Sequence, residues 1–247
     1  MAIVETEQLT KVYGKGETAV TALDHVNLRM EAGEFVAVMG PSGCGKSTLL
    51  HLIGGLDRPT SGRVAVDSHD LAHLSDNDLT TLRRRQIGFV FQFFNLIPVL
   101  AASENAALPL ILDGIKPAQA RARGEEWLKR VGLADRFDHR PDQLSGGQQQ
   151  RVAIARALAA EPALILADEP TGNLDTRAGD EIAALLRQVS DEWGRSVLIV
   201  THDPRIAAYA DRIVFLKDGT IVDETELEPK SGRNVELVAD KMKEMGD

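Results

Sequence analysis

Short apolar runs alternate with segments of helical spacing along most of the chain. Phe35 to Met39 is continuously apolar, which is typical of a strand buried on both faces of a parallel sheet. Gly40 ends this run, and good helix formers follow from Lys46 to Ile53. Similar strand-sized runs recur at Ile87 to Phe91, Leu164 to Ala167 and Val197 to Val200. Strands that alternate with helices predict an α/β fold around a parallel sheet.

Weaker signals add elements around this core. Alternating apolar residues predict strands at Ile3 to Leu9 and around Val26 to Met30. Asp218-Gly219 lies between two apolar stretches, which indicates a hairpin. The other predicted elements are a strand at Val64 to Val66, a helix capped by Ser75 or Asp76 that ends near Arg85, a helix at Thr176 to Val189, and hairpin strands at Ile213 to Leu216 and Ile221 to Val222.

Between Gln92 and about Ala160 the pattern becomes helical. Ser103 is predicted to cap one helix, and Pro117 fits the first position of another. Gly124 lies inside this second helix and weakens the prediction locally. The apolar residues that recur there at helical spacing are Trp127, Leu128 and Val131. A helical insert is therefore expected within the α/β core.

Composition narrows the class of protein. The 247 residues carry a net charge of −9, which argues against a general nucleic-acid binder, although it leaves a local basic patch open. Cys44 is the only cysteine, so a reducing compartment is expected. No leader is recognisable at the start, and every apolar run is shorter than the roughly 20 residues that span a bilayer. Any membrane role is expected to act through a partner.

Residues 40–48 carry the pattern of a phosphate-binding loop between the first core strand and its helix. Glycines let backbone N–H groups wrap a triphosphate, Lys46 brings positive charge to its β and γ phosphates, and the Ser47 hydroxyl can ligate Mg²⁺. The chain is therefore predicted to bind a nucleoside triphosphate. The predicted contacts are Gly40, Pro41, Ser42, Gly43, Cys44, Gly45, Lys46, Ser47 and Thr48.

Two acids follow the apolar run at Leu164 to Ala167. Ligands of open parallel sheets bind at the carboxyl ends of the strands, where these acids are expected to lie. Asp168 is predicted to hold Mg²⁺ through water, and Glu169 to polarise an attacking water. Alone, the pair could simply end a strand; the phosphate loop upstream favours the catalytic interpretation.

A second anion-binding feature lies at Leu144 to Arg151, Leu-Ser-Gly-Gly-Gln-Gln-Gln-Arg. Ser145 is a natural N-cap, and Gly146 and Gly147 leave the first helical N–H groups unshielded. Such a helix start attracts anions through these N–H groups and the helix dipole. Taken alone, the octet also fits an ordinary capped helix.

Together these motifs resemble the nucleotide-binding subunit of an ATP-binding cassette (ABC) transporter, over about Ile3 to Val222. The octet is similar to the family signature, and Asn173-Leu174-Asp175 resembles its D-loop. Three single residues match further family elements, all in the family's order: Gln92 the Q-loop glutamine, His202 the switch histidine, and Tyr13 the aromatic that stacks on adenine. Without the family, these three would be a surface glutamine, a capping histidine and a turn tyrosine.

The resemblance implies a phosphate-loop NTPase core of the RecA-like type. An antiparallel β subdomain and an α-helical subdomain inserted at about residues 93–160 are expected to complete one nucleotide-binding domain, at residues 1–224. A charged tail follows at residues 225–247. Four apolar residues of the tail are spaced to form one face of a short helix: Val235, Val238, Met242 and Met245.

The resemblance also implies an Mg²⁺-dependent ATPase whose cofactors are ATP and Mg²⁺. The implied catalytic residues are Glu169, His202, Lys46 and Gln92, and the implied metal ligands are Ser47, Gln92 and Asp168. The further implied nucleotide contacts are Tyr13, Gln92, Ser145, Gly146, Gly147, Gln148 and Asp175. In the family, two subunits pair head to tail, so the octet contacts the ATP that is held by the other chain's phosphate loop.

The implied partners are a second copy of the chain and a membrane-spanning permease, with no nucleic acid. The chain is then expected at the cytoplasmic face of the inner membrane, in contact with the membrane only through the permease. Two alternatives remain: a soluble ABC ATPase without a membrane partner, and a phosphate-loop GTPase or kinase. The absence of a guanine-recognition motif and the presence of the octet argue against the second.

Within transporters, residues 168–175 and 95–105 resemble the lipoprotein-release, macrolide-export and cell-division ATPases. Export, lipoprotein release or mechanotransmission through the membrane is then the expected output. The apolar surface expected to dock the permease consists of Phe93, Phe94, Leu96 and Ile97, although a core role fits these residues equally well.

Overall fold

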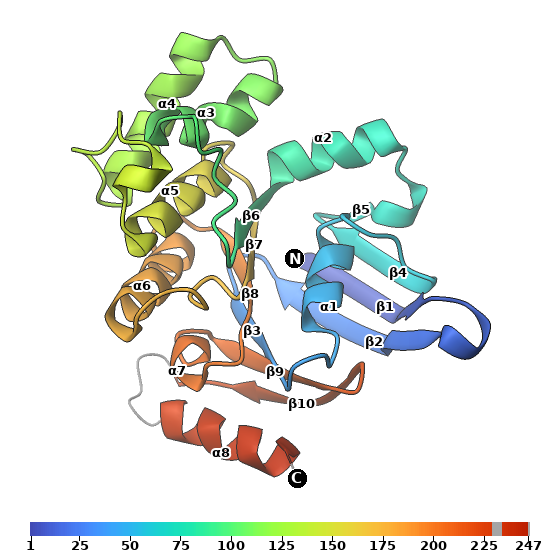
Figure 1. The fold of residues 1–247 in the computed structure, drawn as a ribbon. Coiled ribbons are helices and arrows are strands. Elements are labelled where there is room, and N and C mark those ends of the chain that lie inside the picture. Colours follow the sequence, from blue (N-terminus) through green and yellow to red (C-terminus); the bar gives the residue numbers. More distant parts are fainter. Residues whose placement is uncertain (229–233, 247) are drawn as a thin grey trace.

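Two β-sheets and a group of helices make up the chain, seen in a computed structural model that describes residues 1–228 and 234–246 (Figure 1). A six-stranded sheet has the order β10-β9-β3-β8-β7-β6, and a four-stranded sheet has the order β2-β1-β4-β5. Helices lie on both sides of the larger sheet (Figure 1). The α/β class predicted from the strand–helix alternation is confirmed.

The larger sheet carries the parallel core. Its strands are β3 (Phe35–Met39), β6 (Ile87–Phe91), β7 (Leu164–Asp168), β8 (Ser196–Val200), β9 (Arg212–Lys217) and β10 (Thr220–Glu226). All of them run parallel except β10, which forms the predicted hairpin with β9. The continuous apolar runs are buried on both faces, as expected for parallel strands covered by helices.

Alternate side chains of these strands enter two separate cores. One core holds Ala37, Ala167 and Ile199 together with the helices α5 (Gly146–Leu158) and α6 (Thr176–Asp191). The other core holds Val38, Leu166 and Val200 together with the helix α1 (Lys46–Ile53). Because successive side chains of a strand point to opposite faces, α1 and α5 cover opposite sides of the sheet (Figure 1).

The smaller sheet is antiparallel and packs against α1. Its strands are β1 (Ala2–Tyr13), β2 (Val20–Glu31), β4 (Ser61–Val66) and β5 (His69–Asp70). Leu9, Val26 and Val64 of this sheet join the α1 core. The helix α2 (Asp76–Gln86) leads from here back to β6, and Ser75 caps it by accepting from the Asp78 N–H. The alternative cap, Asp76, is the first residue of the helix.

The helical insert contains α3 (Ala102–Leu112), α4 (Pro117–Arg130) and α5. Pro117 begins α4 as predicted, but the predicted cap Ser103 is wrong: it is buried in the first turn of α3. Carbonyl groups of residues 137 and 139 accept the N–H groups of Ser103 and Ala102, and the Glu104 carboxylate accepts that of Ala101. A hydroxyl cap is not needed where other groups already pair these donors.

Gly124 has a packing role in α4. A Cβ at this position would lie 3.0 Å from both the Ala107 nitrogen and the Ser103 carbonyl oxygen of α3. Glycine thus lets the two helix backbones approach closely, which offsets the helix propensity that it lacks.

The tail begins with Leu227, which is buried, and ends in α8 (Asn234–Gly246). Val238 is buried and Met242 packs against the same core, beside the short helix α7 (Pro204–Ala207). These contacts confirm a helix with an apolar face, although the Met245 side chain lies outside the described part of the structure. No helix in the described ranges has the length and apolar content that crossing a bilayer requires.

Candidate functional site

The phosphate loop joins β3 to α1 in a conformation that glycine makes possible. Gly40 and Gly45 have φ of 154° and 106°, and a Cβ on either would lie within 2.3 Å of a backbone oxygen, that of Leu216 or Ala22. Side chains would therefore push the loop away from β9 and β2. The loop ends at the N-terminus of α1, where free N–H groups favour phosphate.

Lys46 lies over this loop and is 8% exposed. Its Nζ donates to the carbonyl oxygens of Gly40 and Pro41, at 2.8 and 2.9 Å. The ammonium group is thus fixed above the turn whose N–H groups wrap phosphates in such loops. This position fits the predicted contact with a triphosphate.

Two predicted metal ligands meet at the end of β7. The Ser47 hydroxyl donates to Asp168 Oδ1 at 3.0 Å. Hydroxyl and carboxylate oxygens are the ligands that Mg²⁺ prefers, so the pair fits this ion. His51 Nε2 lies 3.9 Å from Asp168 Oδ2, a proximity that the sequence did not indicate.

Glu169 and His202 also lie together. His202 Nδ1 is 2.9 Å from Glu169 Oε1, and the Glu169 N–H donates to the Val200 carbonyl oxygen on the neighbouring strand β8. Glu169 has φ of 45°, which a non-glycine residue seldom adopts. The carboxylate is mostly buried and the imidazole is mostly exposed, so the pair can orient a proton acceptor beside the phosphate loop.

Gln92 follows β6, whose last residue Phe91 pairs in register with Asp168. Its backbone oxygen accepts from Asn173 Nδ2, and a Cβ on Gly172 would lie 2.7 Å from its Nε2. Within the described residues, the Gln92 amide makes no hydrogen bond to Ser47 or Asp168. The structure thus brings Gln92 to the D-loop, and its metal-ligand role stays a prediction.

The octet forms the predicted helix start. The Ser145 hydroxyl accepts from the Gln148 N–H, and Gln148 Oε1 accepts from the Ser145 N–H, which makes a capping box. Gly146 and Gly147 line a cleft with Asp175, which itself caps α6. The cleft joins the octet to the D-loop of the same chain, on the α5 side of the sheet.

Gln150, in the same octet, is a residue whose role the sequence analysis missed. It is fully buried, and its Nε2 donates to the carbonyl oxygens of Phe91 and Pro170. The signature helix is thereby bonded to the segments that carry Gln92 and Glu169. A polar residue within the buried stripe of α5 is the signal that could have indicated this role.

Tyr13 lies at the end of β1 and is 42% exposed. Its hydroxyl donates to Asp57 Oδ2 at 2.9 Å. Burial raises the pKa of Tyr13, and the hydrogen bond to Asp57 raises it further, while Thr48 of the phosphate loop lowers it. The ring therefore lies at the edge of the phosphate loop, where the resemblance places the adenine base.

Cys44 is buried within the loop. Burial raises the pKa of its thiol, although the Lys46 charge acts in the opposite direction. The thiol is therefore protonated near neutral pH.

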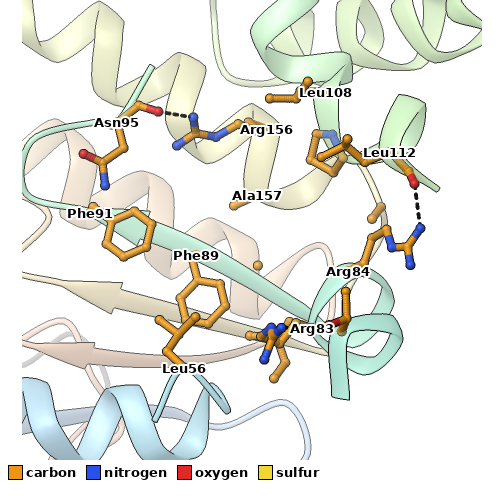
Figure 2. Close-up of a pocket in the computed structure, with 15 residues that line it drawn as sticks. Leu56, Arg83, Arg84, Phe89, Phe91, Asn95, Leu108, Leu112, Arg156 and Ala157 are labelled. Carbon is orange, nitrogen blue, oxygen red and sulfur yellow. Dashed lines mark hydrogen bonds between the residues drawn. The ribbon is translucent and has the colours of Figure 1, made fainter. Parts of the chain in front are cut away.

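A groove separates the core from the helical insert (Figure 2), and we call it the arginine groove. Leu56, Phe89, Phe91, Leu108 and Leu112 give it an apolar floor. Its 15 lining residues include Arg83, Arg84 and Arg156 but no acid, which is unusual for a chain of charge −9. Arg156 donates to the carbonyl oxygens of Phe94 and Asn95, and burial lowers its pKa.

The four residues expected to dock the permease lie next to this groove. Phe93 is 72% exposed, whereas Phe94, Leu96 and Ile97 are partly buried, and Leu96 packs against the core. Phe93 is therefore exposed enough to contact a partner, as the docking interpretation requires, whereas Leu96 packs in the core, as the other interpretation requires.

Comparisons with known proteins agree with the geometry. Residues 23–172 match the family model described as ABC transporter. An uncharacterized ABC transporter ATP-binding protein, MJ0796 of Methanocaldococcus jannaschii, is 51% identical over 91% of this chain and 97% of its own. A solved dimer of MJ0796, described as a post-hydrolysis state bound to ADP and Pi, has a TM-score of 0.83 over 91% of this chain and 99% of that chain, at 50% identity.

Two relatives bear functional names. The lipoprotein-releasing system ATP-binding protein LolD of Geobacter metallireducens is 50% identical over 90% of this chain and 98% of its own. The macrolide export ATP-binding/permease protein MacB of Aggregatibacter actinomycetemcomitans is 46% identical over 92% of this chain, which spans only 35% of MacB. In MacB, by its name, an ATP-binding part and a permease part share one chain.

Proposed function

The chain belongs to the ABC transporter family as an ATP-binding, ATP-hydrolysing subunit, and from this premise we propose that two copies close on ATP and thereby drive a membrane permease. ATP would lie between the phosphate loop of one copy and the octet of the other. The chain would act at the cytoplasmic face of the inner membrane, held there by the permease.

One observation carries this proposal: the two anion-binding helix starts belong to helices on opposite faces of the sheet. The helix α1 follows the phosphate loop, whereas α5 begins at the octet and packs in the other core. Each helix start offers N–H groups to only some of the phosphates of one nucleotide. A second copy that brings its octet to this phosphate loop would therefore complete the site. The solved structure of MJ0796, which is described as a dimer bound to ADP and Pi, supports pairing of two copies.

The chemistry follows from the residues around the loop. Ser47 and Asp168 would hold Mg²⁺, which neutralises charge on the β and γ phosphates when bound. Glu169 would accept a proton from the attacking water, and His202 would orient the Glu169 carboxylate. Lys46, Gly146 and Gly147 would add positive charge and N–H groups around the γ-phosphate.

The arginine groove supplies a site for the permease. Its apolar floor and the guanidinium groups of Arg83 and Arg156, which pair with no acid of the described residues, fit a short amphipathic helix that carries carboxylates; Arg84 already pairs with Asp113. Phe93 would extend this contact along the rim. The relatives LolD and MacB support export or lipoprotein release as the output rather than a soluble ABC activity.

The proposal is tested with the Glu169→Gln variant, which should bind ATP without hydrolysing it. Light scattering is expected to show monomers without nucleotide and dimers with ATP and Mg²⁺, two ATP molecules per dimer. A Glu169→Gln variant that binds ATP and stays monomeric at micromolar concentration would refute ATP-driven closure.

A further inference from the structure

Tyr13 takes part in a small polar cluster that the catalytic scheme leaves unexplained. Besides the bond from Tyr13 to Asp57 Oδ2, the Lys11 ammonium donates to Asp57 Oδ1 at 2.7 Å. The same Nζ lies 4.8 Å from the centre of the Tyr13 ring, over its face. A single carboxylate thus bonds both the hydroxyl of the ring and the cation above it.

The cluster is better ordered than an ordinary surface ion pair. The Lys11 side chain is 12% exposed and also donates to the Arg58 carbonyl oxygen at 2.7 Å. Burial alone would raise the pKa of Asp57, but hydrogen bonds from Lys11, the Arg58 N–H and Tyr13 outweigh it and lower the pKa. Asp57 therefore stays ionised at neutral pH and keeps both partners in place.

The cluster also connects two distant parts of the chain. Lys11 and Tyr13 end β1, whereas Asp57 lies in the turn after α1, the helix that the phosphate loop begins. Nearby, the Val12 N–H donates to the Thr60 hydroxyl, which fixes the backbone between Lys11 and Tyr13. The position of the ring is thus tied to the helix whose other end binds phosphate.

We propose that Lys11 and Asp57 are positioning residues that hold the Tyr13 ring at a fixed place for the nucleobase of the bound nucleotide. This inference rests on the proposed function, in which Tyr13 stacks on adenine. Lys11 occupies one face of the ring, so the base stacks on the opposite face. Asp57 fixes the end of the side chain through its bond to the hydroxyl, and Lys11 over the face restricts rotation of the ring about its own axis. A pre-positioned ring loses less side-chain freedom when the base arrives.

The test separates contact with the base from contact with the phosphates. Affinities for ATP and for ribose 5-triphosphate, which lacks the base, are measured with Mg²⁺ by competition against ribose-labelled ATP. Tyr13→Ala should lower the preference for ATP about tenfold, as the loss of one aromatic stack does. Lys11→Met and Asp57→Asn should each lower it at least about threefold and leave the affinity for ribose 5-triphosphate unchanged.

Two further variants sharpen the measurement. Lys11→Arg keeps a cation over the ring and should retain most of the preference. Adding Asp57→Asn to Tyr13→Ala should cause no further loss, because both act through the same ring. The matched control is Asp76→Asn, which removes an exposed acid paired with Arg58 and should behave as wild type.

The outcomes are distinguishable. If Tyr13→Ala lowers the preference but Lys11→Met and Asp57→Asn do not, the positioning role is wrong and the proposed function stands. If Lys11→Met and Asp57→Asn weaken both ligands equally, their role is structural and the inference is likewise wrong. If Tyr13→Ala leaves the preference intact, the adenine contact itself is refuted, and the inference with it.

Discussion

Glu169 combines an acid at the end of a buried strand with a backbone conformation that costs energy. Its left-handed φ turns the chain directly after β7, so the carboxylate meets His202 at the end of the adjacent strand β8. A non-glycine residue in this region costs of the order of 1 kcal/mol or more, and such strain persists where function requires it. Eight other non-glycine residues of the described chain also have positive φ, so the assignment of Glu169 as the base rests on its contact with His202 rather than on φ.

Replacing the carboxylate by an amide tests this assignment. Glu169→Gln keeps the size of the side chain but cannot accept a proton, so ATP turnover should fall roughly 10²- to 10⁴-fold while ATP affinity changes little. Phosphate release and equilibrium binding measure the two quantities. Glu192→Gln, at the exposed C-cap of α6, should retain normal turnover. Normal turnover by Glu169→Gln would place the base elsewhere.

Cys44 offers a second test at the level of one residue. The thiol is 4% exposed and its pKa is raised, so little thiolate is accessible at neutral pH. N-ethylmaleimide should react at least about tenfold more slowly with the folded chain than with the chain in urea. Once modified and refolded, the chain should fail to bind ATP, because the adduct would fill the loop. Rapid labelling of the folded chain would contradict the buried position.

At the scale of elements, hydrophobic periodicity predicted nearly all of the fold. The strands β3, β6 and β8 lie where continuous apolar runs placed them, since burial on both faces leaves few polar positions. The prediction that Ser103 caps α3 was wrong. The carbonyl groups that accept the first N–H groups of α3 belong to residues 137 and 139, far along the chain. Hydrogen bonds between segments so far apart in sequence cannot be predicted from the local pattern of residues.

The same limit applies to the candidate site. The phosphate loop and the two acids could be predicted from local pattern, because loop, strand and helix are contiguous there. The hydrogen-bond partners of Gln150 and Asp57 could not, since they lie on segments distant in sequence, even though a polar residue in the buried stripe of α5 marks Gln150 itself. Gln92, His202 and Tyr13 were identified through resemblance to a family, and their spacing alone would not have indicated a site.

Gly124 gives a prediction about helix packing. Gly124→Leu gains helix propensity, but its side chain would press on the α3 backbone, which cannot move aside as a flexible side chain would. The free energy of unfolding should therefore fall by about 1–3 kcal/mol, as overpacking of a tight contact does. Urea denaturation measures the change. Ala122→Leu, exposed on the same helix, should stay within about 0.5 kcal/mol of wild type.

At the scale of the whole molecule, the arginine groove predicts the charge of the partner surface. Arg83 donates to the Gly55 carbonyl oxygen and the Thr80 hydroxyl, and no acid of the described residues pairs with it. Arg83→Glu should weaken retention by the co-expressed permease at least about tenfold, because it would oppose like charges. Arg58→Glu, which changes an exposed guanidinium outside the groove, is the control. Equal retention of both variants would place docking elsewhere.

The proposed pairing of two copies also predicts the composition of each site. Each complete ATP site must take its phosphate loop from one chain and its octet from the other. Lys46→Ala removes the first part, and Gly147→Asp puts a carboxylate into the second, where a Cβ has room at 3.4 Å from Ala178. Each variant alone should be inactive. A mixture of the two forms pairs in which one site combines an intact loop with an intact octet.

The mixture should therefore recover about a quarter of the wild-type sites, since about half of randomly formed pairs are mixed and each mixed pair holds one intact site. The matched control mixes the double variant with wild type at the same ratio. Mixed pairs then contain no intact site, and activity should come only from wild-type pairs. Wild-type pairs make up about a quarter of this mixture, so both mixtures should turn over ATP at about a quarter of the wild-type rate at fixed total protein. If the sites lay within single chains, the first mixture would stay inactive, and each wild-type chain in the second would keep its full rate.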